Sequence, residues 1–136
     1  QPARKRLRRP SQPHCGLAAG DVLALDLPAG PVLLRVVRVR VHRKGETPVI
    51  EELDYSGAEL PPPQTLERLG PKLKDWIGLM ATDARFAALM DAKNVGWEQA
   101  GFRKVATIPE KAGDAEAPFP SSGITWHYLA SRYRQR

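Results

Sequence analysis

The most regular hydrophobic pattern of the chain lies in residues 20–43, "GDVLALDLPAGPVLLRVVRVRVHR". Apolar residues alternate with others on both sides of "PAGP", which combines two prolines with a glycine. A period of two is typical of a half-buried strand, and proline with glycine is typical of a tight turn. The pattern therefore predicts a β-hairpin.

The second strand of this hairpin changes phase in its middle. Apolar residues alternate from Val32 to Val36, and a second alternation from Val37 to Val41 is displaced by one position. In a regular ladder such a shift would turn the apolar side chains to the other face of the sheet. We therefore predict a β-bulge near Val36 and Val37, which would also coil the strand as a small barrel requires.

Three cationic side chains, Arg38, Arg40 and His42, share one face of this predicted strand. The turn "KGET" and the strand "PVIEELDYSG" follow, and residues 46–59 contain five acidic residues. Antiparallel pairing would bring Arg38 and Arg40 within reach of these acids, and each cross-strand ion pair contributes about 0.2–1 kcal/mol. We expect this internal pairing. The alternative is an exposed face that binds a polyanion.

The middle of the chain changes from strand patterns to helix patterns. Three prolines occupy residues 61–63, and apolar residues then recur at spacings of three and four from Leu66 to Ile77. This spacing predicts two short helices that are separated at Gly70 and Pro71. Residues 85–90, "RFAALM", fit either a helix or a buried strand, and we favour a strand because the other strands need a partner.

The last third of the chain predicts a turn, a strand and a helix. "NVGWEQAG" indicates a turn or short helix that presents Trp97, and "FRKVATIP" indicates a strand that ends at Pro109. A C-terminal helix follows, for which Ser121 or Ser122 is the expected N-cap. One side of this helix is apolar and carries Trp126, Leu129, Ala130 and Tyr133.

These elements predict an α+β fold. We expect a strongly curved antiparallel sheet or a small β-barrel, with short helices between the strands and at the C-terminus. Residues 17–136 form a single domain in this interpretation. Residues 1–16 form a flexible basic arm, since they contain three prolines and few apolar residues.

Positive charge is concentrated at the two ends of the chain. The net charge is +6, yet eight cationic side chains lie in the terminal segments and leave residues 10–131 at −2. The first segment contributes Arg4, Lys5, Arg6, Arg8 and Arg9, and the last contributes Arg132, Arg134 and Arg136. The nearly neutral middle argues against a folded nucleic-acid platform, whereas clustered arginines on a mobile arm bind phosphate with a strong salt dependence.

Few residues suggest chemistry. His14, Cys15, His42 and His127 do not have the spacing of zinc ligands, and no phosphate loop, nucleophile elbow or metalloprotease motif is present. The acids Glu51, Glu52 and Asp54 could in principle serve acid–base chemistry, but ion pairing with the arginine strand explains them better. We expect no enzyme activity, no cofactor and no metal site.

The sequence also indicates a compartment. The one cysteine excludes an internal disulfide, which favours a reducing compartment, and we expect the cytoplasm. No apolar stretch approaches the roughly 18–20 residues of a membrane span, so we expect no membrane association.

Two segments carry a resemblance to a known group of proteins. "GDVLALDLPAGPVLLRVVRV" looks like the opening hairpin of small bacterial immunity proteins that neutralise contact-dependent or polymorphic toxins, and "GWEQAGFRKVATIP" resembles their closing tryptophan, turn and strand. Together they cover about a third of the chain. The resemblance implies a small SH3-like barrel and a function in protein binding.

Two functions remain open from the sequence. The first is a non-enzymatic immunity-like protein that occludes a toxin's active site, with Glu51, Glu52 and Asp54 facing a basic cleft and Trp97 as an anchor. The second is a nucleic-acid-associated accessory protein. Its contacts would be the arm residues Arg4, Lys5, Arg6, Arg8 and Arg9 together with Arg38 and Arg40 of the strand.

Overall fold

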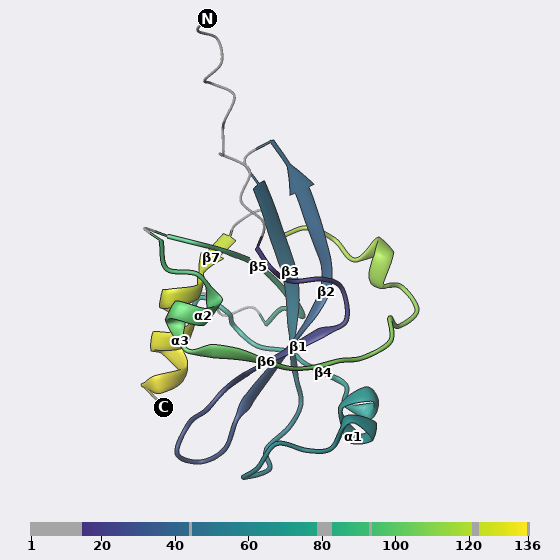
Figure 1. Cartoon of the computed structure of the whole chain (residues 1–136), viewed down its shortest axis with the longest axis vertical. Helices are drawn as coiled ribbons and strands as arrows, with labels where there is room; N and C mark the ends of the chain where they lie inside the picture. The colour runs from purple at the N-terminus through teal and green to yellow at the C-terminus, as the bar shows by residue number, and fades with distance from the viewer. Residues whose placement is uncertain (1–14, 44, 79–82, 93, 121–122, 136) are drawn as a thin grey trace, which may run out of the picture.

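The computed structural model describes residues 15–43, 45–78, 83–92, 94–120 and 123–135 (Figure 1). Its strands are β1 (Asp21–Leu25), β2 (Val32–His42), β3 (Gly45–Leu53), β4 (Pro71–Lys72), β5 (Phe86–Met90), β6 (Phe102–Thr107) and β7 (Gly123–Thr125). Its helices are α1 (Pro63–Arg68), α2 (Trp97–Ala100) and α3 (Trp126–Arg134), with a 3₁₀ turn, η2, at Asp114–Glu116. None of the helices in these ranges is long and apolar enough to cross a membrane.

The seven strands form one mostly antiparallel sheet. Its order is β6-β1-β2-β3-β5-β7, and β4 pairs with the end of β3. Only the pair of β5 and β7 is parallel among the described strands. The α+β class is therefore confirmed. The sheet is open, because the described parts of β6 and β7 lie at its two ends and do not pair with each other.

The predicted hairpin and bulge are both present. β1 pairs with β2 from Val22 opposite Arg35 to Leu25 opposite Val32. In the ladder of β2 and β3, Val36 faces Ile50 and Arg38 faces Val49, so Val37 is the extra residue of a bulge. The bulge resolves the change of phase, because Val36 and Val39 can then pack against the same core.

The two faces of the sheet bury unequal cores. The larger core joins one face to α2 and α3, where Trp126 packs edge to face on Phe102 with ring centroids 5.4 Å apart. The predicted apolar side of α3 is confirmed, since Trp126, Leu129, Ala130 and Tyr133 are all buried. The smaller core lies on the other face, over which Leu66 of α1 packs.

Two local expectations at the ends of elements turned out differently. No second helix begins at Pro71: β4 pairs there with the end of β3, and Leu73 is 60% exposed, so its helical spacing does not reflect burial. The N-cap of α3 is Thr125, whose Oγ1 accepts a hydrogen bond from the Tyr128 backbone N–H at 3.2 Å. Ser121 and Ser122 lie outside the described residues.

The other uncertain segments followed the prediction. "RFAALM" contains strand β5 rather than a helix, and β5 supplies the partner that β3 needs. Trp97 begins the short helix α2, and the strand after it, β6, ends shortly before Pro109.

Candidate functional site

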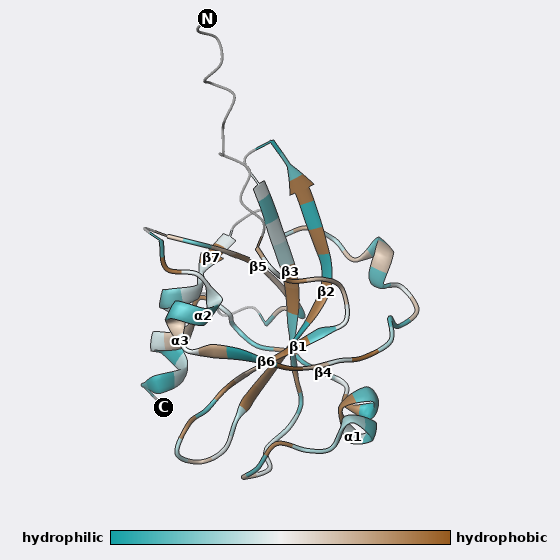
Figure 2. Cartoon of the chain, in the orientation of Figure 1, coloured by the Kyte–Doolittle hydropathy of each residue, from teal (hydrophilic) through white to brown (hydrophobic). Residues whose placement is uncertain are grey.

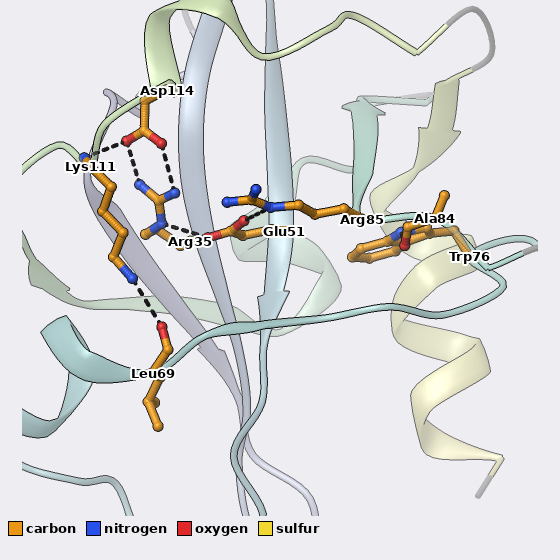
Figure 3. Close-up of polar contacts among 8 residues, drawn as sticks. All are labelled: Arg35, Glu51, Leu69, Trp76, Ala84, Arg85, Lys111 and Asp114. Carbon is orange, nitrogen blue, oxygen red and sulfur yellow. Dashed lines mark hydrogen bonds and ion pairs between the residues drawn. The ribbon is translucent and has the colours of Figure 1, made fainter.

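A buried ion-pair network lies on the face of the sheet that carries the smaller core (Figure 3). Arg35 of β2 is completely buried and donates from Nε to Glu51 Oε2 at 2.8 Å. Its two Nη atoms bind both oxygens of Asp114, at 2.6 and 2.9 Å. Arg85 donates to the other oxygen of Glu51 at 2.7 Å. Two guanidinium groups therefore balance two carboxylates, and the network carries no net charge.

This network fastens the loop after β6 across the sheet. Asp114 belongs to that loop and also accepts from the Lys111 backbone N–H at 2.9 Å, while Lys111 Nζ donates to the Leu69 carbonyl at 2.9 Å. We call residues 109–120 the strap. Burial alone would raise the pKa of Asp114, but the hydrogen bonds from Arg35 and Lys111 and the charge of Arg35 outweigh it and hold this pKa below its usual value.

The strap supplies contacts for the two arginines beyond the bulge. Arg38 Nη1 donates to the Ala117 carbonyl at 2.7 Å, and its guanidinium lies 4.1 Å from the centroid of the Phe119 ring. The Arg40 guanidinium lies 5.0 Å from the same ring centroid. Arg38 is half-buried and Arg40 is exposed. Within the described parts of the chain, neither arginine forms an ion pair with a carboxylate.

The expected pairing of Arg38 and Arg40 with acids of the next strand is therefore wrong. The register of the ladder explains why. It places Glu51 opposite Arg35, whereas Arg38 faces Val49 and Arg40 faces Thr47. Internal neutralisation of the strand does occur, but at Arg35 before the bulge. His42, at the end of the strand, hydrogen-bonds Thr47 Oγ1 at 2.7 Å.

A hollow of about 320 Å³ adjoins these arginines. It lies between the outer half of β2, the strands beside it and the end of the strap. In Figure 2 this half of β2 alternates between hydrophobic and hydrophilic residues, as expected for a strand with one polar face. The hollow is lined by Arg40, His42, Thr47, Ala88, Met90, Phe119, Pro120 and Gly123.

The acids expected at a partner surface are mostly internal. Glu51 is 0% and Glu52 is 3% exposed. The expectation that these two carboxylates face a basic cleft of a partner is therefore wrong. Glu52 lies on the opposite face from Glu51, where it accepts from Tyr133 Oη at 2.7 Å and from Lys74 Nζ at 3.0 Å. Asp54 is exposed and remains available to a partner.

Glu52 also borders a hollow of about 520 Å³. This hollow lies between the turn of the β1–β2 hairpin, the end of β3 and the C-terminal end of α3. The carboxylate at its wall already has Lys74, Tyr133 and, at 3.7 Å, Lys72 as partners. The Glu52 carboxylate is therefore engaged in internal contacts.

Trp97 is half-buried and serves an internal contact. Its indole Nε1 donates to the Cys15 carbonyl at 2.7 Å, and the Cys15 backbone N–H donates to Glu46 Oε1 at 2.9 Å. Trp97 and Glu46 thus hold Cys15, the first described residue, on the domain. Burial, followed by the nearby Glu46 carboxylate, raises the pKa of the Cys15 thiol to about 11. The arm residues Arg4, Lys5, Arg6, Arg8 and Arg9 lie outside the described residues.

Sequence reasoning missed three residues that organise this site: Arg35, Asp114 and Phe119. Arg35 sits within an apolar run, and an arginine there is a signal of a buried charge that needs partners. Asp114 lies 79 positions further along the chain, and no local pattern links the two. Phe119 is an isolated aromatic between two prolines, which is a weak signal of a docked loop.

Comparison of the chain with protein-family models, curated proteins and solved structures finds no match in any of the three. The described residues contain no group of three or more histidine, cysteine, aspartate or glutamate side chains placed to hold a metal ion.

Proposed function

We propose that the protein is a nucleic-acid-associated accessory protein that contacts phosphates through Arg38 and Arg40. One observation carries the proposal. These two arginines share a face of β2, contact the same aromatic ring and have no carboxylate partner among the described residues. By contrast, Arg35, Arg85 and Arg103 all have a carboxylate within 2.8 Å.

The stacking on Phe119 suits anion binding. A cation above an aromatic face is attracted by the ring quadrupole, yet it keeps its charge and its outward N–H donors. Arg38 is further fixed by the Ala117 carbonyl. Ordering these side chains before binding reduces the entropy that is lost when a phosphate is contacted.

The basic arm joins the domain at the end of the molecule that also carries Arg38 and Arg40. Cys15 is bound to Glu46, which pairs with Val41 in the outer part of the β2–β3 hairpin. This hairpin projects from the rest of the sheet (Figure 1). The five arm cations precede Cys15 by only six to eleven positions, and an extended chain spans at most about 3.6 Å per residue. Glu46 lies on the opposite face of the hairpin from Arg38 and Arg40, so arm and strand would contact one nucleic acid around the edge of the hairpin.

The test is a salt titration of binding to a labelled single strand of about 12 nucleotides, followed by fluorescence anisotropy. The full chain should bind with log K falling linearly with log salt. The double variant Arg38→Gln/Arg40→Gln should bind roughly 10- to 30-fold more weakly near 0.1 M salt and lower the slope by about 1.4, because two phosphate contacts are lost. Removal of residues 1–10 should lower the slope further.

The matched control removes two exposed cations elsewhere. Arg68→Gln/Arg103→Gln changes the net charge equally but affects α1 and an ion pair with Asp26. The proposal predicts a much smaller effect for this control. Equal losses for the two double variants would show a general charge effect, and an absence of binding at physiological salt would exclude the function.

The toxin-occluding function implied by the resemblance is a second candidate. Asp54, an expected contact residue, is exposed, and so is the apolar Leu73. Occlusion by an acidic and apolar surface would use these residues in place of the buried glutamates. Asp54→Lys should then slow association with a cognate toxin domain, and an unchanged on-rate would count against this candidate.

A further inference from the structure

The hollow beside Arg40 points to the kind of nucleic acid that is bound. We propose that it receives one unstacked base of a single strand while Arg38 and Arg40 hold the adjoining phosphates. This inference rests on the proposed function and specifies its ligand. It assigns a role to a concave surface that phosphate binding alone leaves unexplained.

The lining of the hollow has the composition of a base-binding site. Its apolar part is formed by Ala88, which is 6% exposed, together with Met90 and Phe119. Its polar groups are the Arg40 guanidinium and the hydrogen-bonded pair of His42 and Thr47. Binding sites for small molecules combine apolar surface with a few placed polar groups. None of the described residues that line this hollow is acidic, so none of them would repel a phosphate.

Met90 is the most informative of these side chains. It lies at the end of β5 and is 43% exposed, although it is apolar. A methionine side chain adapts its shape and makes favourable contacts with aromatic rings. Together with Phe119 and the Arg40 guanidinium, it offers a surface on which a base can stack, and stacking of this kind does not require a particular base.

The geometry favours a single strand over a duplex. In a duplex the bases are paired and stacked inside the helix, so filling the hollow would require a base to be flipped out at a cost of a few kcal/mol. In a single strand the bases are already accessible. The hollow and the arginines adjoin each other because Arg40 belongs to both.

The test compares three ligands of equal length, about 12 nucleotides each. They are a single-stranded oligothymidylate, the same backbone with abasic residues, and a duplex. The abasic strand keeps the phosphates and lacks the bases. The full chain should bind oligothymidylate roughly tenfold more tightly than the abasic strand, which is the effect of one stacked base. The duplex should bind more weakly than oligothymidylate.

Two variants locate the effect. Met90→Ala should weaken binding of oligothymidylate and leave binding of the abasic strand unchanged. Ala88→Leu, which fills the floor of the hollow, should do the same. Leu73→Ala is the control, since Leu73 is an exposed apolar residue that does not line the hollow. Met90 is exposed, so Met90→Ala should leave the fold intact. This variant therefore still tests the inference if Ala88→Leu, at a more buried position, does not fold.

The outcomes separate the two proposals. Equal, salt-dependent binding of base-bearing and abasic strands would overturn the inference and keep the proposed function. Binding of none of the three ligands would overturn both. A preference for bases that survives Met90→Ala and Ala88→Leu would place the base elsewhere and also overturn the inference.

Discussion

Arg35 and Arg38 are chemically identical side chains on one face of the same strand, and they have opposite roles. Arg35 is fully buried and binds two carboxylates, whereas Arg38 contacts a carbonyl and an aromatic ring. The difference arises from the residue across the ladder, because Arg35 lies opposite Glu51 and Arg38 lies opposite Val49. One arginine therefore serves the fold, and the other is available to an external anion.

We expect Arg35→Gln to destabilise the protein strongly. The change leaves Glu51 and Asp114 in the interior without their main cationic partner, and breaking a buried pair in this way typically costs about 3–5 kcal/mol. The measurement is the free energy of unfolding in urea. Arg103→Gln is the control, because its ion pair with Asp26 is exposed and such pairs contribute about 0–1 kcal/mol. Similar losses for both variants would contradict the central place of the network.

We expect Asp114 to make stability depend on pH in the acid range. Its pKa is lower in the folded than in the unfolded chain, so its contribution is complete above the ordinary carboxyl pKa near 4 and is lost as the pH falls through the lower folded value. Asp114→Asn should lower the stability at neutral pH and make the acid-dependent loss smaller. Urea unfolding at several pH values measures both effects, and an unchanged acid dependence in the variant would refute this role.

We expect Cys15 to react slowly with iodoacetamide at neutral pH. With a pKa of about 11, the thiol is almost entirely protonated, and the thiolate is the reactive form. Glu46→Gln should lower this pKa, because it removes a negative charge beside the thiol. The pH dependence of alkylation can be assigned directly, since the chain has one cysteine. A half-maximal rate near pH 8.5 would show that Cys15 is not held on the domain.

At the scale of elements, the bulge in β2 and the strap act together. The bulge keeps Arg38 and Arg40 on the same face as Arg35, and the strap crosses this face with Asp114 at one position and Phe119 five residues later. The buried network at Asp114 thus sets the position of the aromatic ring that orders the surface arginines. The strap connects the stability of the fold to the geometry of the candidate site.

We expect Phe119→Ala to weaken oligonucleotide binding several-fold without changing its salt dependence. The variant keeps every charge but removes the ring that orders both guanidinium groups. Pro118→Ala is the matched control, because Pro118 is an exposed residue of the same strap. Anisotropy titrations at two salt concentrations provide the measurement. A lower salt slope for Phe119→Ala would mean that a charge contact was lost, against this expectation.

The sequence predicted those strands and helices whose formation depends on the pattern of nearby residues. Alternation of apolar residues located β1, β2 and the bulge, and the apolar side of α3 followed from helical spacing. The same reasoning failed at Leu73, where helical spacing occurs without burial. It also failed at the pairing of Arg35 with Asp114, because contacts between distant segments depend on packing that no local pattern encodes.

In the molecule as a whole, the charged side chains form an internal and an external set. The internal set consists of ion pairs around buried carboxylates: Arg35, Glu51, Arg85 and Asp114 balance one another on one face, and Glu52 pairs with Lys72 and Lys74 on the other. The external set includes Arg38 and Arg40 on the projecting hairpin, whose other face carries Glu46, the partner of Cys15. A sum of charges along the sequence could not separate these sets, so the small net charge of the middle of the chain understated its cationic surface.

The proposed binding surface consists of the outer half of β2 and the end of the strap. It can be located by NMR, from the changes in backbone amide chemical shifts when the full chain is titrated with a single-stranded oligonucleotide. We predict that the largest changes occur at residues 38–43, 88–90 and 117–120. Changes centred on Asp54 and Leu73, or on α3, with residues 38–43 unaffected, would show that this surface does not bind the oligonucleotide.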